Sequence, residues 1–349
     1  MGTHSAEICR TILINTAITV KTKGTRSAER SDGMGIKILG TGFYVPENEV
    51  TNDDLSKIVE TSDEWISQRV GVRTRRISNG ESAADFAVKA AEAALKDSGT
   101  APEELDMIVA ATISSDTVCP TVAGWVERAI GAHCPAFDVN SACSGFVFAL
   151  DIAEKYISSG AAKKVLVLGA ERLSKLIDWT DRSTCVIFGD GAGAAVVSAG
   201  EMYESVLYTE GGDEVIKIPS YSLKNNFCDT ENLTPYIYMN GQETFKFAVN
   251  KVVSDIKEVA AKAGIDPSEI DYVVPHQANT RIIEFAAKRL KLPIERIFVN
   301  IQKYGNTSSA SVPIALAELE ASGKLKRNDT VVLTAFGGGL SSAAAIFKW

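Results

Sequence analysis

Two matching pairs of apolar segments decide the fold of this chain. In the first half, VLVLGA (165–170) is followed by GAGAAVVS (191–198), and in the second half VVLTAFGG (331–338) is followed by GGLSSAAAIF (338–347). Each segment is short, continuous and apolar, which is typical of strands covered on both faces of a sheet. The repeated ending indicates that one α/β unit occurs twice.

Helices and strands alternate outward from these segments. The predicted strands are Ile36–Gly42, Asp106–Ile113, Ala136–Asn140, Lys164–Ala170, Gly193–Ser198, Asp271–Val274, Arg296–Asn300, Thr330–Ala335 and Ser342–Lys348. The predicted helices, from apolar periodicity and flanking glycines, are Ser82–Ser98, Thr121–Ile130, Cys143–Ser159, Gln242–Ala263, Thr280–Leu290 and Ser309–Ser322. The alternation favours a layered α/β fold, and coincidental alternation is the competing interpretation.

The chain has 349 residues, which favours about two domains. We predict that residues 34–205 form the first half and residues 206–349 the second. Residues 1–33 are rich in Ser and Thr and lack a secretory cleavage pattern. We expect them to lie outside the fold, as a weak transit peptide, a cloning remnant or the result of an upstream start codon, with Met34 as the true start.

Composition and charge exclude several classes of protein. The chain is 45% hydrophobic, which excludes overall disorder, and its net charge of −8 argues against nonspecific binding to nucleic acid. No apolar run reaches the ~18–20 residues of a membrane span. The six cysteines form no C-x-x-C pair, so we expect no metal site and a reduced, cytoplasmic enzyme or binding protein.

Cys143 is the first candidate for chemistry. It lies in NSACSG (140–145) between a predicted strand and a predicted helix. The partial positive charge of a helix N-terminus favours a thiolate there, although a lone cysteine is more often inert packing. We interpret four other cysteines as packing residues: Cys119, Cys134, Cys185 and Cys228.

His276 and Asn306 are the other candidates. His276 lies in VPHQAN (274–279), directly after a predicted strand, where open α/β folds place ligands. A structural role for this histidine is an equal alternative. Asn306 lies in GNTSS (305–309), which by itself resembles an ordinary helix cap. All three candidates are predicted to follow strands, and a Cys/His/Asn set suits nucleophilic acyl transfer.

The run FGGG (336–339) follows the last long predicted strand. Its glycines let main-chain N–H groups approach a ligand closely, as an oxyanion hole requires. A phosphate loop is a weaker interpretation because no Lys-Ser/Thr follows the run.

Four motifs together resemble one family. SACSGF (141–146), VPHQANTRI (274–282), YGNTSSASVP (304–313) and AFGGGL (335–340) are similar to segments of beta-ketoacyl-acyl carrier protein synthase III. This family comprises the initiating condensing enzymes of type II fatty acid synthesis. The resemblance, which extends from about Ile36 to Trp349, implies a thiolase-like fold, with two pseudo-duplicated α/β halves in a layered αβαβα arrangement.

The resemblance implies roles for the motif residues. Cys143 would accept an acyl group from acyl-CoA, and His276 and Asn306 would hydrogen-bond the thioester carbonyl of malonyl-carrier protein. The backbone N–H groups of Cys143 and Gly338 would form the oxyanion hole, and Phe336 would pack beside the malonyl carboxylate. No cofactor is implied beyond CoA-linked and phosphopantetheine-linked substrates.

The resemblance also implies binding residues. The family match assigns the CoA contacts to Trp65 and Arg182 around the adenine, Thr61 and Arg69 nearby, and Asn279 on the pantetheine arm. It assigns docking of the acidic carrier protein to Lys246, Arg281, Lys288 and Arg289. A merely solvated helix face is the alternative for these cations, and docking contacts would weaken with salt.

Cys119 departs from the family pattern. Members often carry an aromatic residue there, contributed to the acyl pocket across a homodimer. The smaller cysteine leads us to expect primers longer or more branched than acetyl.

Related classes fit the sequence less well. Thiolase proper needs a second catalytic cysteine near the C-terminus, and none follows Cys228. Elongating condensing enzymes usually present two histidines. Chalcone-synthase-like and other acyl-CoA condensing enzymes remain alternatives. The intact motifs oppose a noncatalytic acyl-CoA-binding paralogue, and a papain-like protease lacks its local cysteine motif here.

Overall fold

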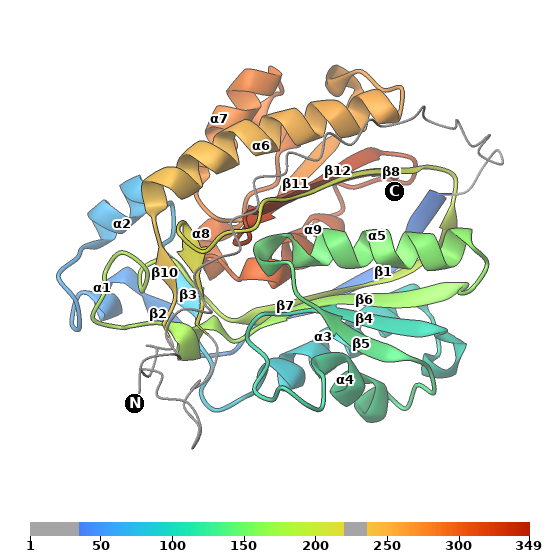
Figure 1. The fold of residues 1–349 in the computed structure, drawn as a ribbon, viewed down its shortest axis with the longest axis horizontal. Coiled ribbons are helices and arrows are strands. Elements are labelled where there is room, and N and C mark those ends of the chain that lie inside the picture. Colours follow the sequence, from blue (N-terminus) through green and yellow to red (C-terminus); the bar gives the residue numbers. More distant parts are fainter. Residues whose placement is uncertain (1–34, 220–235) are drawn as a thin grey trace, which may run out of the picture. The chain divides into compact units, whose positions relative to one another are not determined.

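The computed structural model describes residues 35–219 and 236–349, shown as a ribbon in Figure 1. The predictions for residues 1–33, Met34 and Cys228 fall outside the described residues. The strands are β1 (Gly35–Tyr44), β2 (Glu49–Thr51), β3 (Thr74–Arg76), β4 (Met107–Ala111), β5 (Ala136–Val139), β6 (Lys164–Glu171), β7 (Gly191–Gly200), β8 (Tyr203–Thr209), β9 (Ile216–Lys217), β10 (Tyr238–Met239), β11 (Tyr272–Pro275), β12 (Thr330–Gly337) and β13 (Ser341–Lys348).

The α-helices of the described residues are α1 (Asn52–Leu55), α2 (Asp63–Arg69), α3 (Ala83–Ser98), α4 (Val122–Ile130), α5 (Gly145–Ser158), α6 (Gly241–Lys262), α7 (Thr280–Leu290), α8 (Ile301–Tyr304) and α9 (Ser311–Ala321). Short 3-10 helices are η1 (Pro102–Glu104), η2 (Ala142–Ser144), η3 (Leu173–Leu176), η4 (Pro267–Glu269), η5 (Ile294–Arg296) and η6 (Ser308–Ala310).

Two sheets repeat one strand pattern. The first has the order β1-β7-β6-β4-β5 and the second β11-β12-β13-β8. In the first, β4 runs parallel to β6, β6 antiparallel to β7, and β7 antiparallel to β1. In the second, β11 runs parallel to β12, β12 antiparallel to β13, and β13 antiparallel to β8. The prediction of two pseudo-duplicated halves is therefore confirmed.

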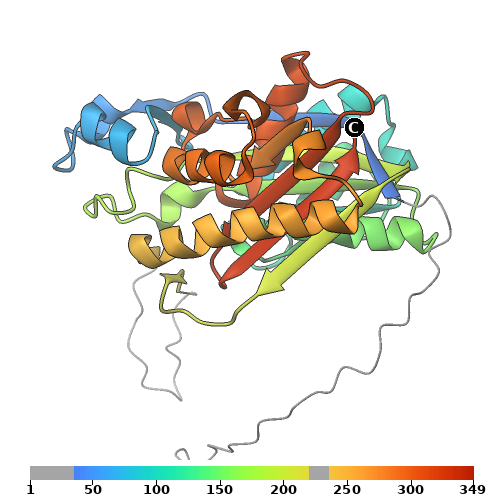
Figure 2. The same ribbon diagram turned by 90° about the horizontal axis from the view of Figure 1, so that it is seen from above.

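Helices cover both sheets on both faces. Helices α3 and α4 pack on the outer face of the first sheet, and α5 and α9 lie between the sheets. Helices α6 and α7 cover the outer face of the second sheet, and Figure 2 shows α6 lying across β12, β13 and β8. Separate apolar cores fill the layers, the central one joining residues such as Val109, Leu316 and Leu333. Because both faces of each sheet are buried, the strands are continuously apolar, and the predicted αβαβα arrangement is confirmed.

Local capping explains where helices begin and end. The Ser82 hydroxyl accepts the Asp85 N–H at the start of α3, and Gly99 ends this helix with φ at +63°. The Asn279 side chain accepts the Arg281 N–H at the start of α7, whose predicted bounds are confirmed.

The strand predicted at residues 296–300 is wrong. Only Ile297 forms a bridge there, pairing in parallel with Val273, after which α8 begins. The Gln277 Oε1 atom accepts the N–H groups of Asn300 at 3.0 Å and Ile301 at 3.2 Å. These bonds satisfy donors at a helix start, so the chain turns into α8 instead of extending the sheet.

The boundary predicted between residues 205 and 206 stays a prediction; β8, which crosses it, belongs to the second sheet. Among the described helices, none is both long and apolar enough to traverse a membrane.

Candidate active site

One cavity of about 1000 Å³ brings the predicted catalytic residues together. Cys143 from the first half and His276 and Asn306 from the second all line it. Phe336 and Gly338 from the glycine run line it as well. The convergence follows from the fold, because the ends of corresponding elements in the two halves face a common space.

Cys143 lies on η2, directly before α5. The preceding residue, Ala142, has φ at +45°, a left-handed conformation that costs a residue with a side chain about 1–3 kcal/mol. Gly337 packs directly against this turn, since a Cβ atom there would lie 2.8 Å from the Cys143 nitrogen. The glycine run thus allows a close approach of its backbone, as the sequence indicated, and the group that it contacts is the backbone of Cys143.

The expectation of a stabilised Cys143 thiolate stays a prediction, and the burial of the sulfur opposes it. Burial raises the pKa of the thiol to about 12, and the nearby Glu171 carboxyl adds to this rise. The Ser308 hydroxyl lowers the pKa but does not offset the burial. Cys143 lies within the η2 turn, directly before Ser144, which is the N-cap of α5.

His276 directly follows β11 and is held in one orientation. Its backbone N–H donates to the Thr334 carbonyl at 2.7 Å, and its ring packs edge-on against Phe336 with the ring centroids 5.3 Å apart. The side chain is 2% exposed, and burial lowers its pKa to about 3, so the ring is neutral. The Ser311 Oγ atom lies 2.5 Å from Nδ1.

The Ser311 hydroxyl occupies one ring nitrogen of His276. The Gln277 N–H donates to the Ser311 hydroxyl at 3.4 Å, and the same hydroxyl can donate its proton to Nδ1. A neutral imidazole that accepts at Nδ1 carries its proton on Nε2. In this tautomer, Nε2–H is the donor that His276 offers a substrate.

Asn306 does not follow a strand, contrary to the prediction. It follows α8 and Gly305, whose φ is +66°. A Cβ atom added to Gly305 would lie 2.6 Å from the Ile187 carbonyl oxygen, so only glycine fits there. The Asn306 N–H donates to this carbonyl at 2.9 Å, and its own carbonyl accepts from Gly189 at 3.0 Å. Its Oδ1 accepts the Ser308 N–H at 2.8 Å, which leaves the amide N–H₂ as the donor group.

Gln277 is a functional residue that the sequence analysis missed. Its Nε2 donates to the carbonyls of Pro275 at 2.7 Å and Phe298 at 3.2 Å, while Oε1 accepts from the start of α8. The buried amide thereby ties the His276 loop to the segment that leads to Asn306. A polar residue beside a candidate histidine was the available signal.

The predicted CoA-binding residues lie in two groups joined by α2. The Arg182 guanidinium lies 5.3 Å from the centroid of the Trp65 ring and donates to the Glu60 carbonyl beside Thr61. At the other end of α2, Asn279 donates to the Arg69 carbonyl at 3.0 Å. Asn279 lines the cavity, whereas the described lining residues do not include Trp65 or Arg182.

The predicted docking cations lie on α6 and α7. The Arg281 guanidinium lies 5.6 Å from the ring centroid of Phe245, a residue that lines the cavity. Lys288 and Arg289 are exposed further along α7. Lys246 pairs with Glu243 at 2.6 Å, which reduces its contribution to the positive surface.

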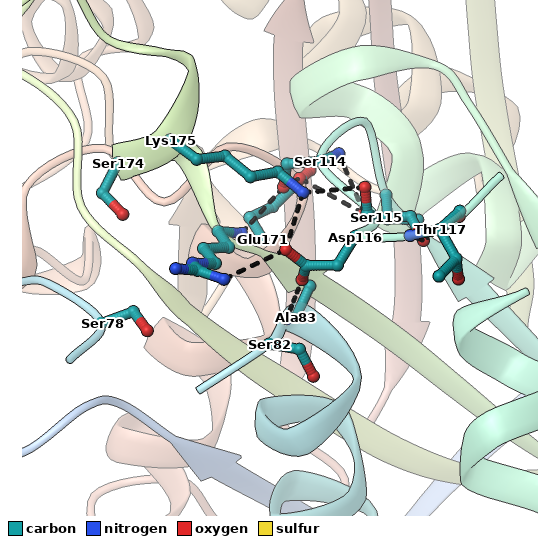
Figure 3. A network of polar contacts seen from close by, with 12 residues as sticks. Ser78, Ser82, Ala83, Ser114, Ser115, Asp116, Thr117, Glu171, Ser174 and Lys175 are labelled. Carbon is teal, nitrogen blue, oxygen red and sulfur yellow. Dashed lines mark hydrogen bonds and ion pairs between the residues drawn. The ribbon is translucent and has the colours of Figure 1, made fainter. Parts of the chain in front are cut away.

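The wall of the cavity next to β4 carries a polar network, drawn in Figure 3. Lys175 donates to the Ser115 carbonyl at 2.8 Å and to Asp116 at 3.0 Å, and Arg172 pairs with the same carboxylate at 3.1 Å. The other Asp116 oxygen accepts the Ala83 N–H at 2.8 Å. The network fixes the loop that leads to Cys119.

Cys119 is exposed rather than packed, so the packing interpretation is wrong for this residue. Its neighbour Val118 is 79% exposed. Among the described residues of this chain, Cys119 is not part of the cavity lining. Its expected contact with an acyl group therefore stays a prediction that requires a second copy of the chain.

Comparisons with known proteins agree with this geometry. Family models described as 3-oxoacyl-[acyl-carrier-protein (ACP)] synthase III and its C-terminal part match residues 137–212 and 260–349. A beta-ketoacyl-[acyl-carrier-protein] synthase III of Clostridium acetobutylicum is 48% identical over 320 residues, 90% of this chain and 98% of its own length. The Aquifex aeolicus protein of that name is 49% identical over 323 residues, 90% of this chain and all of its own.

A crystal structure shows the same relationship in three dimensions. The 3-oxoacyl-[acyl-carrier-protein] synthase III from Aquifex aeolicus VF5 superimposes with a TM-score of 0.84 at 48% identity, covering 90% of this chain and 100% of that one. The chain therefore belongs to the beta-ketoacyl-[acyl-carrier-protein] synthase III family and has its thiolase-like fold.

Proposed function

We propose that this chain catalyses the initiating condensation of type II fatty acid synthesis. It transfers an acyl group from acyl-CoA to Cys143 and then condenses this group with malonyl-acyl carrier protein. The products are 3-oxoacyl-acyl carrier protein, CoA and CO2. The observation that carries the proposal is the convergence of Cys143, His276 and Asn306 from both halves on one cavity.

In the first half-reaction, the Cys143 sulfur attacks the thioester carbonyl of acyl-CoA. Because burial keeps the pKa of this thiol high, Cys143 keeps its proton until the attack and loses it during the attack. The C–S bond to CoA breaks, and CoA departs as its thiol. The backbone N–H groups of Cys143 and Gly338 serve as donors to the tetrahedral oxyanion.

In the second half-reaction, the malonyl group loses CO2, and an enolate forms at its thioester oxygen. No base is needed to remove a C–H proton, so two donors aimed at that oxygen suffice. His276 offers Nε2–H and Asn306 its amide N–H₂, each contributing on the order of 3 kcal/mol. The enolate carbon attacks the acyl carbonyl on Cys143, and the sulfur leaves and regains a proton.

The surroundings of the donors suit decarboxylation. Phe336 packs edge-on against His276 and gives the malonyl carboxylate an apolar neighbour. A carboxylate held against an apolar wall is destabilised relative to neutral CO2. The reaction requires no cofactor beyond its CoA-linked and phosphopantetheine-linked substrates.

Charge near the cavity supports docking of an acidic carrier protein. Arg281 lies against Phe245 of the cavity lining, and Lys288 and Arg289 extend the positive surface along α7. The substrate arm would pass Asn279, while Trp65 and Arg182 hold the CoA adenine. Arg281→Glu should raise the KM for malonyl-carrier protein and reduce its salt dependence, with acylation by acetyl-CoA unchanged. An unchanged KM would contradict docking at α7.

A homodimer completes the proposed enzyme. Strand β5 is the outermost strand of the first sheet and offers an edge for pairing with a second copy. Val118 is 79% exposed, and Trp125, on the helix α4 that contacts β5, is 40% exposed, which gives apolar surface to bury. The partner's copy of the loop at Cys119 would close the acyl pocket. We place the enzyme in the cytoplasm, where its thiols stay reduced.

Acyl transfer tests the proposal directly. Radiolabelled acetyl-CoA should label the wild-type protein and the control Cys134→Ala, but not Cys143→Ala. Addition of malonyl-carrier protein should then release 3-oxoacyl product. His276→Ala and Asn306→Ala should still acylate yet fail to condense. Label retained by Cys143→Ala would contradict the assignment of the nucleophile.

Primer choice is tested separately. Turnover of acetyl-, isobutyryl- and hexanoyl-CoA is compared in the wild type and in Cys119→Phe. We expect the wild type to accept the larger primers and the variant to shift toward acetyl, because the larger side chain fills the pocket. Strict acetyl preference in the wild type would overturn the expected role of Cys119.

A further inference from the structure

Glu171 is a fully buried carboxyl that the proposed mechanism does not use. It is the last residue of β6 and lies behind the turn that follows Asn306. One carboxyl oxygen, Oε2, accepts the Ile113 N–H at 3.2 Å and a hydrogen bond from the Ser114 hydroxyl. The other, Oε1, lies 2.6 Å from the Ser309 hydroxyl. Figure 3 shows Glu171 beside Ser114, in the polar network that also contains Asp116 and Lys175.

A proton on this carboxyl lets both hydrogen bonds of the Ser309 hydroxyl form at once. Ser309 Oγ lies 2.9 Å from the Ala111 carbonyl oxygen as well as 2.6 Å from Glu171 Oε1. A hydroxyl has one proton, and a carbonyl can only accept. When Ser309 donates to Ala111, the proton between Ser309 and Oε1 comes from Glu171.

The second oxygen completes the pattern. The Arg172 N–H donates to Ser114 Oγ at 2.8 Å, so the Ser114 proton points to Glu171 Oε2. In this arrangement Oε2 accepts and Oε1 donates to the Ser309 hydroxyl, as in a carboxylic acid, while Oε1 also accepts the Ser309 N–H at 3.4 Å. Burial also raises the pKa of Glu171.

Within the part of the chain that the structure describes, the cation next to Glu171 in sequence pairs with another carboxylate. Arg172, the next residue, directs its guanidinium to Asp116 at 3.1 Å. The other titratable neighbour is the Cys143 thiol, whose pKa is raised further by negative charge on Glu171. A carboxylate here would oppose thiolate formation and the enolate of the condensation step.

We propose that Glu171 is a positioning residue of the condensation step, a neutral carboxylic acid that ties the Asn306 turn to the wall of the acyl pocket. The inference rests on the proposed function. Ser309, its partner, lies between Ser308, whose N–H holds Asn306, and Ser311, which holds His276. A shift of Ser309 would move both donors away from the thioester oxygen.

Two substitutions separate the neutral acid from a charged one. Glu171→Gln keeps one acceptor and one donor, so condensation should stay within about threefold of the wild type, the effect of one imperfect hydrogen bond. Glu171→Ala releases Ser309 and should lower kcat of condensation about a hundredfold, as a misplacement of roughly 1 Å does, with acylation of Cys143 and KM little changed. Glu320→Gln, at a half-buried carboxyl bonded to Thr41, is the matched control.

Two readouts do not depend on the substrates. The infrared difference spectrum between the wild type and Glu171→Gln at neutral pH should contain a carboxylic-acid C=O band. The pH dependence of Cys143 alkylation should be the same in both proteins. A carboxylate band, or alkylation shifted to lower pH in Glu171→Gln, would show that Glu171 is charged and overturn the inference.

Different measurements would contradict the proposed function and the inference about Glu171. A wild type that does not condense acetyl-CoA with malonyl-carrier protein contradicts the proposed function, while the spectrum and the alkylation still test the neutral acid. A wild type that condenses, with Glu171→Gln as impaired as Glu171→Ala, contradicts the inference about Glu171 alone.

Discussion

The hydroxyl of Ser311, at the first turn of α9, lies 2.5 Å from Nδ1 of His276, at the end of β11. The two residues come from elements separated by 35 positions in sequence. When Ser311 donates to Nδ1, His276 presents Nε2–H to the cavity.

Ser311→Ala should impair condensation selectively. Without the hydroxyl, His276 can adopt the other tautomer and present an acceptor where a donor is needed. We expect the condensation rate to fall on the order of 10- to 100-fold, less than complete removal of a donor. Single-turnover assays should show unchanged acylation of Cys143, and Ser311→Thr should restore condensation. Equal loss in both half-reactions would contradict the role.

The stability of the protein should fall as the pH drops because of His276. Burial lowers the pKa of His276 to about 3, below the value of about 6.5 in an unfolded chain. Between these values the unfolded state binds the proton, so His276 destabilises the fold as pH falls from about 6.5 toward 3, by up to about 1.4 kcal/mol per pH unit.

Urea unfolding at pH 7 and pH 5 measures this effect. His276→Asn should lose less stability between the two pH values than the wild type does. The exposed His133→Asn is the control and should behave as the wild type does. An equal loss in His276→Asn and the wild type would show that His276 is already charged in the native state.

Gly337→Ala should disable the oxyanion hole. The added Cβ would lie 2.8 Å from the Cys143 nitrogen and 2.9 Å from its Cβ, so the turn that carries the nucleophile must shift. Loss of one such donor typically lowers kcat about 10²–10³-fold. Gly211→Ala, where an added Cβ meets nothing within 4 Å, is the matched control. Rapid acylation of Gly337→Ala by acetyl-CoA would contradict this prediction.

Gln277→Ala should destabilise the fold around the site. The substitution removes four hydrogen bonds and leaves buried backbone groups of Pro275, Asn300 and Ile301 without their partner. We expect the free energy of unfolding to fall by about 2–4 kcal/mol, measured by urea denaturation. Gln68→Ala, at an exposed pair with Glu64, should cost less than about 0.5 kcal/mol. Equal effects of the two substitutions would contradict the structural role of Gln277.

Helices and strands were predicted correctly where the interactions that form them come from nearby residues in the sequence. Helix α7 was predicted at its observed bounds because its cap, Asn279, and its apolar face all lie within the helix segment. The strand predicted at residues 296–300 was wrong because the bonds that begin α8 come from Gln277, more than twenty residues away. A sequence pattern over a few residues cannot predict such a long-range contact.

The candidate site divides along the same line. The motifs identified Cys143, His276 and Asn306, because a motif depends only on the residue types at neighbouring positions in the sequence. Their surroundings were not foreseeable: the raised pKa of Cys143 depends on burial by both halves. Ser308 to Ser311 read as an ordinary serine-rich helix start, yet three of these serines hold Asn306, Glu171 and His276.

The sequence by itself determined the duplicated α/β architecture, the family and the reacting residue types, because apolar periodicity and contiguous motifs act over a few residues. Only the tertiary structure decided which atom of each side chain can serve a substrate. Nε2 of His276 and the amide N–H₂ of Asn306 are the donors because Ser311 and Ser308 occupy the other atoms. Hydrogen-bond partners and burial exist only once distant segments have packed together.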